Sequence, residues 1–500
     1  MIASYQALTA RLADLTAIEE SLGILMWDQD VMMPHGAGAS RGRQIATLSA
    51  LHHQGLSGNE MGQLLRELAH APDLDLIAQA NVREATRDHA RAAKIPEALV
   101  RKWATVTVHA HEIWVQARKN SDFSLFEPAL TEIVALAKER AAAVDPTRPA
   151  YDVLMDEFEP GMTMAQLDVV FAELKAVLVP LIARVRARQA QGGLPDTAWL
   201  QTAVDPAQQR HVGERIVQKL AFDFQRGRLD TSVHPFCGGA GIDDVRITTR
   251  YFEHAFLLSL SGMIHETGHA LYEQGRPAHL ADQPVSRPRS MGIHESQSLL
   301  WEKQVGQSAA FWQPNYLQLQ QDYPFLAAVP FNDFVFGLNL VNLGNFIRVN
   351  ADELTYPLHV VVRYEIERDL MSGALAVADI PQAWNDKIHS YLGITPPDAA
   401  LGCLQDVHWS SGSIGYFPSY TLGAVYAAQF MQAARQTIDV DASMRAGDTA
   451  PLLAWLRANV HQAGSQYLTD ELVTRATGRP LDTAPFLAYL TRKYTALYGL

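Results

Sequence analysis

The most informative feature of the sequence is a pair of histidines, His265 and His269, with Glu266 directly after the first. Residues 257–274 around them are mostly apolar and rich in helix formers, so we expect a helix there, ended by Gly275 in a left-handed conformation. Side chains four positions apart project from one helix face on successive turns, so both imidazoles can hold one metal ion while Glu266 faces a water beside it. The spacing therefore predicts a zinc site.

The site needs a third ligand, and the following residues of the same helix do not provide one. One class of zinc peptidases has a glycine and a histidine at fixed offsets after the pair, but here those offsets hold Tyr272 and Gly275. Glu273 continues the histidine face one turn later, but about 6 Å of extra rise places it beyond reach of the ion. Glu273 is therefore a candidate for the surroundings of the site, and the third ligand must come from another element.

A second helical pattern begins at His294, after a loop at residues 284–292. We predict Glu295 as the third ligand, supplied by this second helix, with His294 as the alternative. Glu302 follows seven residues later on the same face and is expected to hydrogen-bond a ligand histidine, as the surroundings of such sites usually require.

This set of ligands indicates a catalytic rather than a structural metal. Two neutral imidazoles and one carboxylate leave the fourth position of a tetrahedral ion open, and zinc in such a site lowers the pKa of its water to about 7. Glu266 could take a proton from the water and return it to a departing amine, so amide hydrolysis is the predicted reaction. The competing interpretations are two incidental histidines on a helix, and a helical binding protein with an inactive metal site.

The elements that would position these groups are mainly helices. Across residues 5–25 apolar side chains recur every three or four positions, which is the pattern of one helical face, and Pro34 lies beyond its end. Similar patterns predict helices at residues 39–52, 74–93, 97–118, 125–143 and 164–189. We therefore expect the first 200 residues to be helical throughout.

The chain changes character after residue 226, where Gly238, Gly239 and Gly241 lie close together. Residues 245–251 alternate β-branched or aromatic side chains with basic or polar ones, which predicts a strand. Helical patterns then return and continue to the C-terminus.

The sequence has no internal repeat and no abrupt change in composition that would mark a domain boundary. We expect a single catalytic unit over residues 1–500. Its helical N-terminal part would span about residues 1–200, and the metal and substrate site about residues 230–425.

The composition is that of a globular protein and disfavours several kinds of partner. Of 500 residues, 48% are hydrophobic, and 54 acidic against 41 basic residues give a net charge of −13, which disfavours nucleic acids and anionic lipids. No stretch has the apolar length of a membrane span, and the N-terminus lacks a secretory signal pattern. Cys237 and Cys403, the only cysteines, are expected to be packed thiols, so we predict a cytoplasmic protein.

Five separated blocks of residues carry a wider resemblance. They are His234-Pro235-Phe236; Asp244-Val245-Arg246-Ile247-Thr248; the histidine pair with His294-Glu295-Ser296-Gln297; Ile347-Arg348-Val349-Asn350-Ala351-Asp352; and Gly402-Cys403-Leu404-Gln405-Asp406-Val407-His408-Trp409. Together and in this order, they make the chain resemble the carboxypeptidase Taq family of zinc metallocarboxypeptidases along nearly its whole length. Trp27-Asp28-Gln29, ahead of Met33-Pro34, also resembles the family. One departure is Leu299, where some members have an arginine.

The resemblance implies a mainly α fold: a large helical body with a deep active-site cleft and a small β-sheet near the metal helix, similar to neurolysin-like peptidases. It also implies a homodimer that removes single residues from the C-termini of peptides with broad side-chain tolerance. The family carries zinc, and cobalt can replace it in some members, as a site of two imidazoles and one carboxylate permits.

A carboxypeptidase must bind the free α-carboxylate of its substrate, and a bidentate arginine is the strongest side chain for this purpose. Arg348, in one of the family blocks, is the predicted residue, with Arg246 and Arg363 as alternatives. The competing interpretation of Arg348 is a surface salt bridge.

Further candidates surround the reaction itself. His408, Tyr416 and Tyr420 could donate hydrogen bonds to the transition-state oxyanion or the substrate, and they lie in a segment whose glycines and proline predict a loop. Each could equally be structural. His234 could orient substrate or simply cap a turn before Pro235.

Two alternatives stay open at this point. The strand at residues 245–251 could offer a free edge to an extended peptide, or could only brace the metal helix. An endo-acting oligopeptidase would use the same zinc chemistry without a carboxylate-binding arginine.

Overall fold

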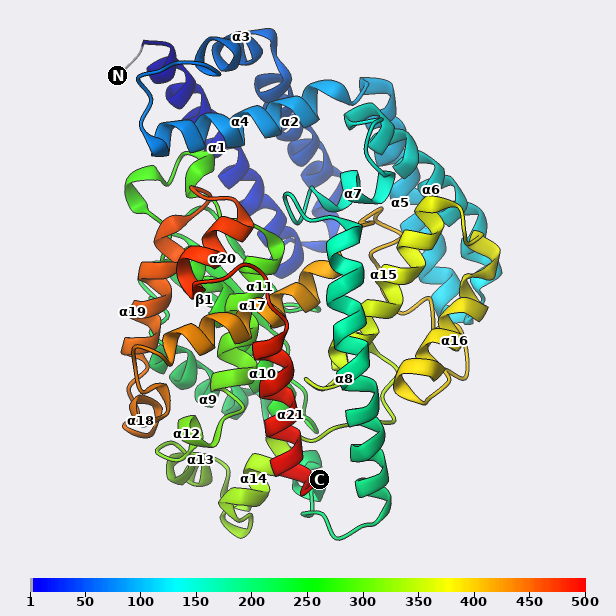
Figure 1. The fold of residues 1–500 in the computed structure, drawn as a ribbon, viewed down its shortest axis with the longest axis vertical. Helices are drawn as coiled ribbons and strands as arrows, with labels where there is room; N and C mark the ends of the chain where they lie inside the picture. The colour runs from blue at the N-terminus through cyan, green and yellow to red at the C-terminus, as the bar shows by residue number, and fades with distance from the viewer. Residues whose placement is uncertain (1–2) are drawn as a thin grey trace.

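The computed structural model describes residues 3–500, which form a mainly helical body with one small sheet (Figure 1). The predicted fold class is confirmed: mainly α, with a small sheet that packs against the helix of the histidine pair. Across the described residues, every helix is too short or too polar to cross a membrane.

The N-terminal part is helical, as predicted. Its helices are α1 (Ala3–Val31), α2 (Gly38–Ser57), α3 (Asn59–Leu68), α4 (Leu76–Lys94), α5 (Glu97–Asn120), α6 (Phe123–Val144), α7 (Ala150–Met155), α8 (Met164–Ala190) and α9 (Pro206–Lys219). All six helices predicted from periodicity are present, with ends displaced by a few residues. The sequence did not predict α3, α7 or α9. α3 and α7 span only 10 and 6 residues, so their apolar pattern repeats too few times to be distinguished, and the 14 residues of α9 are mostly polar.

Local side-chain chemistry fixes where several of these helices begin. The Asp75 carboxylate accepts a hydrogen bond from the Ala78 backbone N–H at 2.8 Å, which caps α4. Thr163 and Gln166 form a reciprocal capping box at the start of α8.

Three short strands, β1 (Gly227–Thr231), β2 (Cys237–Gly239) and β3 (Val245–Thr249), form a sheet in the order β1-β3-β2. β1 runs parallel to β3, and β2 runs antiparallel to it. The predicted strand is β3. The sequence does not indicate β1 and β2, because β1 is short and polar and β2 has only three residues, two of them glycines.

The central position of β3 decides between its two predicted roles. Val245 is paired with Gly227 on one side and with Gly239 on the other, so both edges of the strand are occupied. The prediction that this strand offers a free edge to a peptide is therefore wrong. Bracing agrees with the structure, because Val245 and Ile247 are buried and β3 packs against α10 (Phe256–Glu273).

The helices after α10 complete the body. They are α11 (Met291–Leu299), α12 (Ala309–Trp312), α13 (Tyr316–Asp322), α14 (Phe331–Leu338), α15 (Tyr356–Ser372), α16 (Ile380–Leu392), α17 (Pro418–Ala434), α18 (Val440–Arg445), α19 (Ala450–Asn459), α20 (Thr469–Thr477) and α21 (Ala484–Tyr498). A π-helical turn, η5 (Leu300–Val305), continues α11. In Figure 1, α10, α11 and α17 lie in the middle of the molecule, below α1 to α4.

The end of α10 differs from the prediction. Gly275 is not among the residues with positive φ, and the helix ends through Gln274 in a right-handed conformation. A Cβ at Gly275 would lie 2.5 Å from Nδ1 of His461, so close packing, rather than a left-handed turn, requires glycine here.

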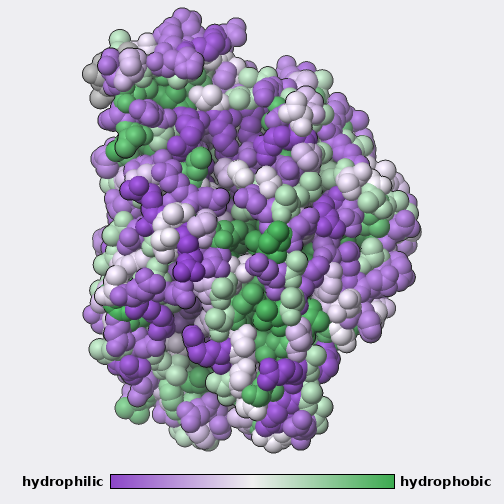
Figure 2. All heavy atoms as spheres, in the orientation of Figure 1, coloured by the Kyte–Doolittle hydropathy of each residue, from purple (hydrophilic) through white to green (hydrophobic). Residues whose placement is uncertain are grey.

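The apolar side chains form one large core and a smaller cluster at the N-terminus. The smaller cluster joins α1, α3 and α4 through residues that include Leu8, Leu12 and Leu65. Figure 2 shows that most of the visible surface is polar, with apolar groups gathered over α8 and α21, where Val177 and Leu487 line a groove.

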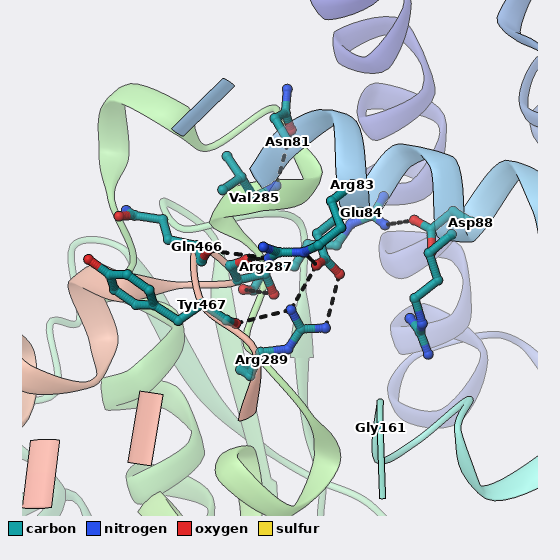
Figure 3. Close-up of polar contacts among 12 residues, drawn as sticks. Asn81, Arg83, Glu84, Asp88, Gly161, Val285, Arg287, Arg289, Gln466 and Tyr467 are labelled. Carbon is teal, nitrogen blue, oxygen red and sulfur yellow. Dashed lines mark hydrogen bonds and ion pairs between the residues drawn. The ribbon is translucent and has the colours of Figure 1, made fainter. Parts of the chain in front are cut away.

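Polar contacts join the N-terminal helices to the loop that precedes α11 (Figure 3). Arg289 in this loop is buried and donates to both carboxylate oxygens of Glu84 on α4, at 2.8 and 2.9 Å. Arg287 donates to Asp88 at 2.9 Å and to Glu19 of α1 at 2.6 Å. The N-terminal helices therefore fix the loop from which α11 starts.

Replacing Glu84 with glutamine should lower the free energy of unfolding by about 1–3 kcal/mol, because the buried Arg289 guanidinium loses a charged acceptor. The melting temperature measures this change. Arg101→Gln is the matched control, since Arg101 forms an exposed pair with Glu97 worth about 0.3–0.5 kcal/mol. Equal melting temperatures for the two variants would contradict a structural role for the buried pair.

Candidate metal centre

Helix α10 carries the histidine pair and presents both imidazoles on one side. The opposite side of the helix is apolar and buried, through residues that include Leu260, Met263 and Leu271. His265 and His269 lie one turn apart, with ring centroids separated by 4.9 Å. The rings are thus fixed by a helix that is itself held in the core.

Helix α11 brings Glu295 to the same point. Its Oε2 lies 3.6 Å from Nε2 of His265 and 3.3 Å from Nε2 of His269. One ligand atom from each of the three residues falls within 4.8 Å of the other two, a spacing that one ion can bridge. The structure therefore brings together the three ligands predicted from sequence.

Two glycines allow the helices around Glu295 to approach so closely. A Cβ at Gly268 of α10 would lie 2.5 Å from the carbonyl oxygen of Gln297 on α11. A Cβ at Gly423 of α17 would lie 2.6 Å from Cγ of Glu295 itself. The absence of side chains at these two positions sets the distance from Glu295 to the histidines.

We expect Gly268→Ala to weaken metal binding by at least about 10-fold, because a displaced α11 would carry Glu295 away from the histidines. Competition with a chromophoric chelator measures the affinity. Gly262→Ala is the matched control: it changes another glycine of α10, and its added Cβ would meet no atom within 4 Å. A Gly268→Ala protein with unchanged affinity would show that the helix contact does not position the ligand.

The outer nitrogen of His265 meets a carboxylate. Nδ1 of His265 lies 2.9 Å from Oε2 of Glu302, as predicted for that glutamate. The other oxygen of Glu302 accepts from Ser261 and from Lys303, both at 2.7 Å. Despite burial, Lys303 and His265 hold the pKa of Glu302 well below its usual range, so this carboxylate is ionised.

The outer nitrogen of His269 meets another imidazole. Nδ1 of His269 lies 2.6 Å from Nδ1 of His294, and Nε2 of His294 lies 2.8 Å from Oε1 of Glu273. Both nitrogens of His294 are thus engaged away from the convergence point, so the geometry does not support His294 as the alternative third ligand. Glu273 contacts the site through His294, in agreement with the surrounding position predicted for it.

Glu266 is buried beside the convergence point, with 6% of its surface exposed. Its pKa is raised to about 7, chiefly by burial and in smaller part by the nearby carboxylates of Glu295 and Glu302, while the charge of His265 lowers it. A carboxyl group with a pKa near neutrality can both accept and return a proton, which suits a general base.

The three candidate arginines differ in how many donors they have free. Arg363 is fully buried and donates to Asp406, to Gln405 and to the carbonyl of His359, which leaves little for a substrate. Arg246 places Nε and one Nη on Asp244, both at 2.7 Å, and stacks on Trp27. Arg363 is thus committed to its neighbours, whereas Arg246, paired with Asp244 beside Trp27, keeps three of its five N–H groups without an acceptor among the described residues.

Arg348 lies in a short 3₁₀ turn, η7 (Arg348–Asn350), and is 4% exposed. Its Nε and Nη2 donate to Oδ1 of Asp406 at 3.1 and 2.9 Å, and Nη1 donates to the Tyr356 hydroxyl at 3.2 Å. Its guanidinium lies 4.5 Å from the ring centroid of Tyr420. One N–H group on Nη1 and one on Nη2 have no acceptor among the described residues. These two donors could therefore bind a carboxylate. The competing interpretation of Arg348 was a salt bridge at the surface; its salt bridge with Asp406 is instead buried.

His408, Tyr416 and Tyr420 form one aromatic group next to Arg348. Nε2 of His408 lies 3.1 Å from the Tyr420 hydroxyl, and the rings of Tyr416 and Tyr420 are 5.2 Å apart. Burial raises the pKa of both tyrosines, and the charge of Glu295 contributes, so both phenols stay protonated close to the predicted ligand. Tyr420 lies in α17 and not in a loop as predicted.

His234 contacts neither the metal-binding group nor the aromatic group beside Arg348 among the described contacts. It is exposed in the turn before β2, and its carbonyl accepts a hydrogen bond from Ser232 at 2.6 Å. This contact uses the backbone of His234 and the side chain of Ser232, so both roles predicted for the imidazole stay predictions.

Comparison with known proteins decides the family. The model of the Carboxypeptidase Taq (M32) metallopeptidase family matches residues 7–494. The chain belongs to this family. It is 40% identical over 498 residues to Thermostable carboxypeptidase 1 of Thermus thermophilus, and the match covers 97% of each chain.

Among solved structures, the match to M32 carboxypeptidase from Deinococcus radiodurans covers 100% of both chains, at 37% identity and a TM-score of 0.96. Metallocarboxypeptidase 1 of Trypanosoma cruzi covers 98% of this chain and 99% of its own, at 37% identity and a TM-score of 0.94.

These matches confirm the family predicted from the five sequence blocks. Membership in a metallopeptidase family makes the chain a peptide hydrolase and implies a metal cofactor, which the group of His265, His269 and Glu295 could hold. The interpretation as an inactive binding protein is thereby removed.

One residue that organises this M32 site was not found from the sequence. Glu367 of α15 is fully buried and accepts from the Tyr151 hydroxyl at 2.8 Å, from Nε1 of Trp409 at 2.9 Å and from the Gly415 backbone at 3.0 Å. It thereby holds the loop that contains His408. An acid among the apolar side chains of Val360, Tyr364, Leu370 and Met371, with Arg363 one turn before it, was the available signal.

Proposed function

We propose that the protein is a zinc-dependent carboxypeptidase that removes residues one at a time from the C-termini of peptides, with broad side-chain specificity. The observation that carries this proposal is the convergence of His265, His269 and Glu295 beside the buried Glu266, with Arg348 and its tyrosines nearby. The names of the relatives, which are carboxypeptidases, support it.

The donor set fits zinc. Two imidazole nitrogens and one carboxylate oxygen are the ligands of catalytic zinc sites, and cobalt accepts the same set. When bound, the ion would polarise the scissile carbonyl group and lower the pKa of the attacking water. His265, His269 and Glu295 would hold it.

We assign the proton transfers to Glu266. It would remove a proton from the attacking water and deliver it to the leaving amine, and its burial keeps competing bulk water away from the carboxyl group. Nε2 of His408 lies 3.1 Å from the Tyr420 hydroxyl, and we propose that the N–H of His408 donates to the Tyr420 oxygen so that the Tyr420 hydroxyl donates to the oxyanion.

We assign recognition of the substrate's α-carboxylate to Arg348. Asp406 accepts from one side of the guanidinium and Tyr356 from one Nη, which would orient the open end of the fork. Tyr416 would contact the substrate beside it. Arg246 and His234 remain candidates for contacts further along the peptide, and Arg246 has N–H groups for such a contact while it stays paired with Asp244.

For the assembly and location, we propose a cytoplasmic homodimer in which residues 1–500 act as one catalytic unit. The family resemblance supports the dimer. The acidic net charge of −13 supports a protein that binds neither nucleic acid nor membrane.

A pair of peptides of identical sequence, one a C-terminal acid and the other its amide, tests the proposed reaction. We expect the zinc-loaded enzyme to shorten the acid one residue at a time, and to cleave the amide at least about 10-fold more slowly because the charged contact with Arg348 is lost. Mass spectrometry of timed samples identifies the products. Internal cleavage of both peptides at equal rates would favour the endo-acting oligopeptidase instead.

A further inference from the structure

The two histidines of the proposed metal site are supported in different ways. Nδ1 of His265 meets the carboxylate of Glu302 at 2.9 Å. Nδ1 of His269 meets no carboxylate, and instead lies 2.6 Å from Nδ1 of His294. Metal-binding histidines usually donate their outer N–H to a carboxylate, a carbonyl or water, so an imidazole acceptor calls for an explanation.

Only one placement of protons satisfies these contacts. His269 must offer the lone pair of Nε2 to an ion beside Glu295, so its proton is on Nδ1. Nδ1 of His294 must then accept, which places the proton of His294 on Nε2. That nitrogen lies 2.8 Å from Oε1 of Glu273, which can accept it. His269 thus donates to His294, and His294 donates to Glu273, so the hydrogen bonds form one chain.

The chain crosses between the two helices that carry the proposed ligands. His269 and Glu273 belong to α10, one turn apart, and His294 reaches them from α11. Arg276 lies 2.9 Å from Oε2 of Glu273 and holds that carboxylate from the other side. The ring of Tyr272 is 5.5 Å from the ring of His294, so an aromatic contact also packs against His294.

Adjacent residues of α11 therefore contact both nitrogens of one imidazole. Glu295 lies at Nε2 of His269, at 3.3 Å, and His294 lies at Nδ1, at 2.6 Å. Rotation of the His269 ring would break both contacts, and displacement of α11 would move the neighbouring ligand with it. The orientation of His269 and the position of Glu295 are coupled through this pair.

We propose that His294 is a positioning residue for the metal site, and that it fixes the ring of His269 through a hydrogen-bond chain anchored by Glu273 and Arg276. This inference rests on the proposed metal site and adds to it a residue outside the ligand set. His294 acts through His269 and does not contact the ion. Its loss should therefore be seen first in metal affinity, and only then in turnover.

The test compares metal binding by three variants of the full chain. His294→Ala removes the acceptor, and we expect its affinity for Zn²⁺ to fall by about 10- to 100-fold, the usual cost of losing such a partner. His294→Asn keeps an oxygen near the position of Nδ1 and should recover a part of that loss. Glu273→Gln retains the size of the anchor but removes its charge, and should give a smaller loss than His294→Ala.

Affinity is measured by chelator competition, and the visible absorption of the Co²⁺-loaded protein reports ligand geometry independently of activity. His279→Ala, an exposed histidine between the same two helices, is the matched control and should bind both metals as the unchanged protein does. If His294→Ala folds poorly, judged by its melting temperature, the comparison of His294→Asn with Glu273→Gln takes its place.

Two results would separate this inference from the function it rests on. Variants of His294 and Glu273 that bind Zn²⁺ within twofold of the unchanged protein, with the same Co²⁺ spectrum, would overturn the positioning role and leave the metal site intact. Failure of the unchanged protein to bind either metal would instead remove the proposed function, and this inference with it.

Discussion

Glu266→Gln is expected to retain its metal and to lose at least about 100-fold in kcat, which corresponds to about 2.7 kcal/mol in the activation barrier. Glutamine has nearly the same shape as glutamate, so the neighbouring ligands His265 and His269 keep their positions on α10. The amide cannot take a proton from water, however, and the transfer that Glu266 would carry out is lost. Turnover of a free-acid peptide and metal content by elemental analysis measure the two quantities.

The burial of Glu266 makes the comparison informative. It is 6% exposed, and burial is the main cause that raises its pKa to about 7; among the described residues no basic side chain forms a salt bridge with it, so substitution with a neutral side chain breaks no ion pair. Glu112→Gln, at an exposed position of α5, serves as the control and should leave kcat unchanged. A Glu266→Gln enzyme with normal turnover would disprove the assigned base.

The sequence predicted the parts of the site that depend on local geometry. The separation of His265 and His269 by one helical turn depends only on α-helix geometry, and the carboxylate of Glu295 could be assigned because a new helical pattern starts just before it. Glu302 was predicted as a partner for a ligand histidine, and the structure has it 2.9 Å from His265.

What the sequence could not predict are contacts between distant segments. The approach of α10 and α11 depends on Gly268 meeting the backbone at Gln297, and a single glycine in a helical pattern does not reveal its neighbour. The parallel pairing of β1 with β3 likewise depends on tertiary structure, and it occupies the edge that was expected to be free. Glu367 was missed because its three donors come from two parts of the chain that are distant from it in sequence, Tyr151 and the loop of Trp409 and Gly415.

The second large effect is expected at Arg348. Arg348→Ala should lower kcat/KM for a free-acid peptide by about 100-fold, since two charge-assisted hydrogen bonds to the α-carboxylate would be lost, each worth about 1.5–3 kcal/mol before compensation by water. Hydrolysis of the matching amide, which has no such contact to lose, should change little. The ratio of the two rates is therefore the quantity to measure.

The structure makes this variant unusually easy to interpret. Removal of the Arg348 side chain does not leave Asp406 as an unpaired buried charge, because Arg363 also donates to it, at 2.6 Å. The fold should tolerate the change, and a lower rate can be assigned to lost recognition. Arg246→Ala is the comparison, since Arg246 is the remaining predicted alternative and is already bonded to Asp244 through two nitrogens. If Arg246→Ala abolishes the preference for the acid and Arg348→Ala preserves it, the carboxylate is bound by Arg246 at the strand β3 and not by Arg348.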